Sequence, residues 1–173
     1  MTNDKAIAHL ESIRHDIRDE IKRRIEQRDK YSIQLTIALG AIVALSFSTT
    51  GFRIAIVAAP LVSIYFTVLI LYSYRIHRIL AHYLRDNIEP TLARLCGTPP
   101  EIEWETYYAA HAVPGIRRRF FLFALWVVSL GSAGYLWIAG REQSDFELRV
   151  ALVVASVIYI LVAAVVTRAF WEN

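Results

Sequence analysis

Arginine and lysine side chains that could bind anions gather in three short clusters. The clusters consist of Lys22, Arg23 and Arg24, of Arg75 and Arg78, and of Arg117, Arg118 and Arg119. Guanidinium groups bind phosphate oxygens through paired hydrogen bonds, and ammonium groups bind them as point charges. These clusters therefore predict either an anchor for lipid headgroups or a regulatory site for a nucleotide or nucleic acid.

Other residue types that often do chemistry are present without the spacing that their chemistry requires. The five histidines form no HExxH motif, and His77 and His82 are too far apart in register to share a helix face. Cys96 is the single cysteine, and the sequence contains neither a glycine-rich phosphate loop nor a nucleophile elbow. We therefore predict a protein that is not an enzyme and that uses no cofactor and no metal.

The hydrophobic residues make up 55% of the chain and are concentrated in four long runs. The runs cover residues 31–47, 54–72, 120–139 and 148–167. A helix needs about 20 apolar residues to cross a hydrocarbon core. The sequence therefore predicts an all-α integral membrane protein with four transmembrane helices, arranged as two hairpins over 32–73 and 120–168.

The basic residues indicate an orientation for these spans. Of the nineteen Lys and Arg residues, sixteen lie in the N-terminal segment, in the central segment or, as Arg168, just before the C-terminal tail, and three lie near the short turns between spans. Basic residues are retained on the cytoplasmic side of a membrane. We expect a multi-pass protein of the inner, or cytoplasmic, membrane with both termini in the cytoplasm. Its cytoplasmic parts are then 1–31, 74–119 and the tail 169–173.

Two apolar stripes predict that the cytoplasmic parts are helical and pack together. Isoleucines and Leu10 recur every three or four residues from Ile7 to Ile25, and nothing breaks the helix before the first span. A second stripe of apolar residues continues from Ile76 to Leu95, through Pro90, which should kink the helix, and ends at Gly97. We expect the two stripes to zip into an antiparallel stalk, followed by a short helix from Glu101 that Thr98 caps.

The spans contain no ionisable residue in their centres, which argues against a proton relay or an ion-coupled pump. Small residues instead recur at every fourth position of the first two spans. This candidate pore or packing stripe consists of Thr36, Gly40, Ala44, Ser48, Ala55, Ala59, Ser63 and Thr67. Such residues let helices approach closely, either inside one four-helix bundle or around the axis of a homo-oligomer. In the second case their hydroxyls would line a narrow pore.

The layout of Ile21 to Leu95 resembles that of small two- and four-span membrane effectors of prokaryotic antiphage defence. The shared features are a basic helix, a tight two-span hairpin and a long amphipathic cytoplasmic helix. The resemblance implies a membrane pore or disruptor that a cytoplasmic signal switches. The second hairpin lies outside it, and no functional residue follows from it.

The sequence thus favours a homo-oligomeric, channel-like effector of four or five subunits in a lipid bilayer, gated from the cytoplasm. The alternative is a membrane anchor or scaffold that recruits a soluble cytoplasmic protein through its helices. A third, less favoured, hypothesis is an enzyme subunit without its own active site.

Overall fold

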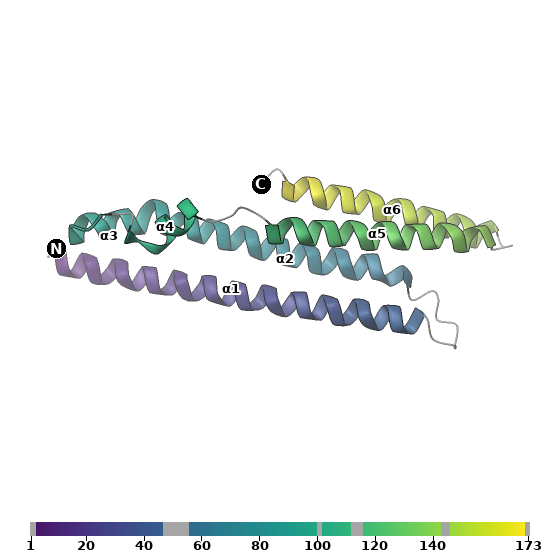
Figure 1. Ribbon diagram of the computed structural model, residues 1–173, viewed down its shortest axis with the longest axis horizontal. Coiled ribbons are helices and arrows are strands. Elements are labelled where there is room, and N and C mark those ends of the chain that lie inside the picture. Colours follow the sequence, from purple (N-terminus) through teal and green to yellow (C-terminus); the bar gives the residue numbers. More distant parts are fainter. Residues whose placement is uncertain (1–2, 47–55, 100–101, 112–115, 143–145, 172–173) are drawn as a thin grey trace. The chain divides into compact units, whose positions relative to one another are not determined.

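The computed structural model describes residues 3–46, 56–99, 102–111, 116–142 and 146–171. Throughout these residues the regular structure is helical, which confirms the all-α class (Figure 1). The chain divides into two compact units. Unit 1 comprises Met1–Asp29 and Tyr72–Gly115, and unit 2 comprises Lys30–Leu71 and Ile116–Asn173. Which side of a membrane each segment faces stays a prediction.

Helix α1 runs without interruption over Asn3–Ser46. Its sequence contains no proline, and Gly40 is its one glycine. Asp4 lies in the first turn, where a negative charge complements the helix dipole. The predicted continuous helix is thereby confirmed as far as Ser46, whereas the turn after it and the stripe residues Ser48 and Ala55 lie outside the described residues.

Three helical segments follow one another from Ala58 to Cys96. Helix α2 covers Ala58–Tyr83, a π-helical turn η2 covers Leu84–Ile88, and helix α3 covers Glu89–Cys96 (Figure 1). The Glu89 N–H donates to the Leu84 carbonyl five residues earlier. Pro90, where the sequence predicts a kink, has no N–H and a ring that crowds the preceding turn, and the wider π turn accommodates it.

The predicted stripes pack together to form the core of unit 1. Leu84, Ile88 and Leu92 are buried with Ile21 of α1, and partly buried apolar residues of α1 and Leu80 pack against them. Ile79 and Tyr83, which also belong to the predicted second stripe, are instead exposed. One partner helix, α1, covers only a narrow strip of this face. Residues beside that strip, such as Ile79 next to Leu80 and Tyr83 next to Leu84, therefore stay exposed.

Gly97 ends α3 with φ 69°, in the left-handed conformation that glycine adopts without steric cost. The next helix, α4, covers Trp104–His111. It begins later than predicted, because a 3₁₀ turn at Ile102 precedes it and the Ile102 N–H donates to the Pro99 carbonyl at 3.3 Å. Thr98 therefore does not immediately precede α4, and Glu101, where the sequence predicts the helix to begin, lies outside the described residues.

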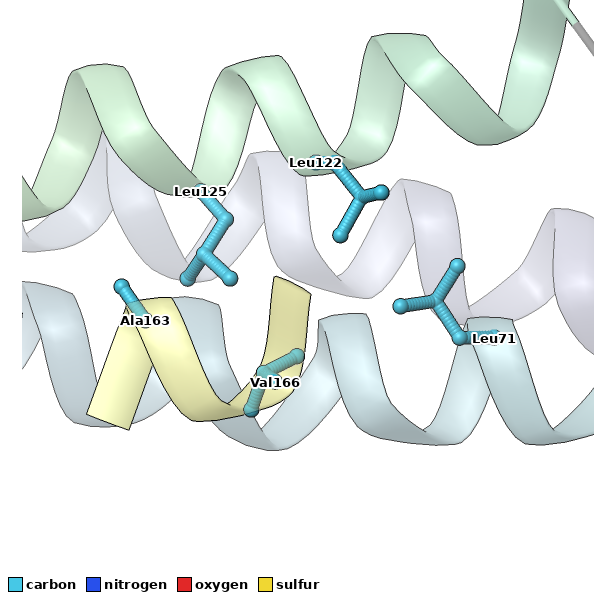
Figure 2. Packing of buried hydrophobic residues seen from close by; sticks show 5 residues of the cluster. All are labelled: Leu71, Leu122, Leu125, Ala163 and Val166. Atoms are coloured by element: carbon cyan, nitrogen blue, oxygen red, sulfur yellow. The ribbon is translucent and has the colours of Figure 1, made fainter. Parts of the chain in front are cut away.

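Unit 2 contains α5, over Ile116–Glu142, and α6, over Phe146–Trp171. These two helices lie side by side along much of their length, with Cα atoms within 8 Å (Figure 1). Leu71 of α2 joins Leu122 and Leu125 of α5 and Ala163 and Val166 of α6 in a buried cluster (Figure 2). This cluster is the apolar centre of unit 2.

Three helical stretches among the described residues are long and apolar enough to cross a membrane. They are Ala58–Cys96, Arg119–Ile138 and Arg149–Phe170. The described apolar part of α1, residues 31–46, is shorter than the roughly 20 residues that cross a hydrocarbon core. The fourth predicted span therefore stays a prediction.

Candidate functional site

The first half of the small-residue stripe lies on the exposed side of α1. Thr36, Gly40 and Ala44 are all exposed, whereas Leu35, one position away, is buried. A Cβ atom added at Gly40 would meet no heavy atom within 4 Å. This half of the stripe therefore makes no close helix contact within the described part of the chain.

The second half of the stripe lies on the buried side of α2. Ala59, Ser63 and Thr67 are 6%, 1% and 1% exposed. They occupy the same helix face as Leu71, which reaches the apolar cluster of unit 2. The two halves of the stripe thus have different surroundings. The small residues of α2 are packed inside the protein, whereas those of α1 are exposed.

Serine hydroxyl groups are also buried on α5 and α6 of unit 2. Ser129, Ser132 and Ser156 are each less than a tenth exposed. Ser156 donates to the Leu152 carbonyl of its own helix at 2.9 Å, while the Ser129 hydroxyl has no hydrogen-bond partner among the described residues. Serine is common both in packed helix interfaces and on surfaces, so the sequence alone did not single out Ser132 and Ser156.

The side chains of the basic clusters differ in how far they are exposed and paired. Lys22 and Arg23 are exposed on α1, but Arg24 donates to Glu20 at 2.6 Å and to Gln27 at 3.3 Å. Arg75 and Arg78 are exposed on α2 within the same unit. The third cluster belongs to unit 2. Its Arg119 side chain is exposed, and the side chains of Arg117 and Arg118 lie outside the described part.

A second set of polar contacts joins α1 to α2 inside unit 1. The Ser73 hydroxyl donates to the Arg24 carbonyl at 3.0 Å. The guanidinium of Arg28, only 6% exposed, lies 4.1 Å from the centre of the Tyr74 ring. A cation over an aromatic face is stabilised by the ring quadrupole. These contacts fix the register of the two helices, and the apolar stripes alone did not predict them.

The most completely buried charged side chain of the described residues is Glu89, in α3, at 0% exposed. Its two carboxylate oxygens accept hydrogen bonds from the N–H groups of Glu105 and Thr106, both at 3.1 Å, and from the Thr106 hydroxyl at 3.0 Å. Those N–H groups lie in the first turn of α4 and have no partner within the helix. Glu89 therefore does for α4 what an N-cap side chain does, but from another helix.

Two arginines of α1 complete this arrangement. Arg14 forms a 2.9 Å ion pair with Glu103, and an Arg18 nitrogen lies 3.8 Å from Glu89. Burial, and then the negative charge of Glu89, raise the pKa of the Glu105 carboxyl. Glu103 is thus paired with Arg14, and Glu105 lies in the turn that Glu89 caps. No pattern in the sequence around Pro90 indicates that the charged side chain of Glu89 is buried.

Neither the buried hydroxyls of unit 2 nor the charged residues of unit 1 offer a metal site among the described residues. No group of three His, Cys, Asp or Glu side chains within the described ranges is placed to hold an ion. The chemistry available is hydrogen bonding by hydroxyls in unit 2 and ion pairing by arginines and carboxylates in unit 1.

No family model, curated protein or solved structure matches this chain. The resemblance in layout to membrane effectors of antiphage defence stays a prediction.

Proposed function

We propose that this protein is a four-span membrane protein whose copies assemble into a pore or channel-like effector controlled from the cytoplasm. The observation that carries the proposal is the uncovered small-residue face of α1. Thr36, Gly40 and Ala44 form a stripe of the kind that packs helices together, yet they are exposed in the single chain. A second copy of the same helix supplies the missing partner.

The chemistry of the spans supports an assembly over a single-chain transporter. The centres of the apolar runs contain no Asp, Glu, Lys, Arg or His, so one chain has no charged relay through its interior. A ring of α1 helices around an axis would place Thr36 hydroxyls beside apolar side chains on a common path. Narrow apolar constrictions of this type gate by dewetting.

The α1 stripe is a better candidate for the axis than the α2 stripe. Ser63 and Thr67 are already buried within unit 2, so their exposure at an axis would require the unit to open. Gly40 needs no such rearrangement, because the space around it is open. Four or five copies remain our expected number, and the basic clusters remain candidate sites for headgroups, a nucleotide or a nucleic acid.

Ion flux from liposomes that contain the purified protein tests this function. We expect the parent chain to pass ions and the Gly40→Leu variant to lose most of that flux, because added bulk separates closely packed helices. Gly134→Leu on α5 is the matched control, since Gly134 is also exposed and has no heavy atom within 4 Å of an added Cβ. Flux that is absent from the parent under all conditions, or equal in both variants, would remove the pore.

The orientation can be tested with the single cysteine. Cys96 is exposed and follows α3 in the predicted cytoplasmic segment. An impermeant thiol reagent should leave it unlabelled in intact cells and should label cysteines introduced at Thr50 or Ser144, which we place in the outer turns. Labelling of Cys96 from outside would reverse the proposed topology.

A scaffold is the second candidate, and the surface of α4 favours it. Trp104, Tyr107 and Tyr108 are each more than half exposed, and none of the residues of α4 is buried. Aromatic side chains of this type often anchor protein interfaces. Silent liposomes together with a soluble partner that binds through Trp104 would support the scaffold over the pore.

A further inference from the structure

The position of α4 in unit 1 is unusual for a packed helix. It contains eight residues, and every one of its side chains is at least partly exposed. Its aromatic rings stack on one another, with Trp104 6.0 Å from Tyr108 and Tyr107 4.2 Å from the His111 ring. Apolar burial, which holds most helices in a fold, therefore contributes little to holding α4 in place.

Polar contacts at one end of α4 replace that burial. The Glu89 carboxylate accepts three hydrogen bonds from the first turn of α4, and Arg14 pairs with Glu103 just before the helix begins. Along the rest of the helix no comparable contact to α1, η2 or α3 is described. The attachment is concentrated in one buried carboxylate and one ion pair.

A helix of this length cannot persist once that attachment is lost. Isolated helices shorter than about 12–15 residues are marginal in water. Loss of the cap therefore unfolds α4 as well as detaching it, so docking and helix formation are one event. Segments that order and disorder in this way are common switching elements.

We propose that α4 is a releasable latch, which folds onto unit 1 when Glu89 caps it and which unfolds when that cap is broken. The inference concerns the regulation of the proposed effector, but the latch itself does not depend on whether the protein conducts ions.

The latch has a mechanical consequence that follows from chain geometry. Eight helical residues span about 12 Å at 1.5 Å per residue, whereas the same residues can reach about 28 Å when extended. Along the chain, α4 lies between α3 and α5, one of the apolar helices long enough to cross a membrane. Release of α4 therefore lengthens the tether that leads into α5, and docking shortens it.

Hydrogen–deuterium exchange of the full chain in a lipid nanodisc tests the latch. In Glu89→Gln, which removes the charge of the cap but keeps its size, amides of residues 102–111 should exchange on the order of tenfold faster or more. Amides of α1 and α3 should keep the exchange rates of the parent. Unchanged protection of α4 would overturn the proposal, as would an equal acceleration throughout unit 1, which would make Glu89 a general support of the fold.

Two further variants keep the test decisive if Glu89→Gln does not fold. Arg14→Gln removes the partner of Glu103 and should also accelerate exchange within residues 102–111. Glu20→Gln removes an ion pair of the same helix, that of Arg24, and should leave α4 unchanged. If both variants accelerate α4 equally, or neither does, the latch is not held by the contacts that we assign to it.

Discussion

Units 1 and 2 are both helical, but different interactions determine how their helices are held. In unit 1, apolar stripes meet in a narrow seam, and buried or half-buried charged groups such as Arg28, Glu89 and Glu103 fix the details. In unit 2, the buried side chains of the described residues are apolar or carry a hydroxyl group, as in Leu125, Ser63 and Tyr159, and none of them is Asp, Glu, Lys, Arg or His.

This difference matches the surroundings that we propose for each unit. Water excludes apolar groups and so drives the stripes of unit 1 together. Lipid tails are as apolar as leucine, so helices in a membrane associate through close packing and small residues instead. A polar contact can therefore act as a switch in unit 1, whereas unit 2 offers faces for packing.

The largest predicted effect comes from a charge placed in the seam of unit 1. Leu84 is 0% exposed, and Leu84→Asp buries an unpaired carboxylate at a cost of about 3–5 kcal/mol. Limited proteolysis should cut unit 1 of this variant faster while unit 2 stays protected. Ile79→Asp, at a position that is 59% exposed, is the control and should change stability by no more than about 0.5 kcal/mol. Equal cutting of both variants would show that the two stripes do not pack.

Truncation of a leucine in the apolar cluster of unit 2 should lower the stability of the protein less than truncation of a buried leucine in a water-soluble protein does. Leu125→Ala leaves a cavity beside Ala163 and Val166. The expected loss is about 2 kcal/mol, at the low end of the range for buried leucines, because the lipid reference state removes much of the transfer energy. Thermal melting in detergent should show it, and Phe123→Ala, on the exposed side of α5, should not. A loss near the upper end of that range would mean that unit 2 excludes water as a soluble core does.

The polar contacts between α1 and α2 should contribute less to stability than the apolar cluster of unit 2 does. Ser73→Ala removes the hydrogen bond to the Arg24 carbonyl, at a cost of about 1 kcal/mol in chemical unfolding of the protein. Thr91→Ala is the matched control, because the Thr91 hydroxyl donates to the Asn87 carbonyl one turn earlier, in η2, on an exposed face. An equal effect of the two would indicate that Ser73 does not join the helices.

The smallest predicted effect is a dependence on pH that is confined to unit 1. Burial first, and then Glu89, raise the pKa of Glu105 above that of the unfolded chain. A group of this kind stabilises the fold fully below its unfolded pKa, and the contribution is lost as pH rises through the folded pKa. Unit 1 should therefore gain stability from Glu105 as pH falls from neutrality through that raised value.

Glu105→Gln should remove this part of the pH dependence and stabilise α4 at neutral pH, which chemical denaturation at a series of pH values can measure. Glu147→Gln, in the first turn of α6, is the control because Glu147 lies in unit 2. An unchanged pH profile in Glu105→Gln would contradict the assignment.

Sequence patterns were sufficient for the helices and for much of the seam. The isoleucine stripe, the buried Leu84, Ile88 and Leu92, and the stop at Gly97 all follow from periodicity and backbone preference. The inward face of the apolar half of α1 could not be predicted in this way. Apolar residues occupy all sides of that segment, so periodicity does not distinguish Leu35 from Thr36.

The cap on α4 could not be predicted for a different reason. It depends on a contact between residues sixteen and seventeen positions apart, Glu89 with Glu105 and Thr106. The π turn before Pro90 also lies between α2 and α3, and a change in helical period rotates every later side chain. A burial pattern drawn with a constant period therefore gave no reason to place Glu89 inside.

Disulfide cross-linking through α1 tests the central claim most directly. The chain has one cysteine, so Cys96→Ser combined with Gly40→Cys leaves a thiol that can form a disulfide only between copies. Oxidation in native membranes should convert most of this variant to a covalent dimer, whereas Gly134→Cys in the same background should stay monomeric. Monomer at position 40, or equal cross-linking at both positions, would contradict an assembly built on the exposed face of α1.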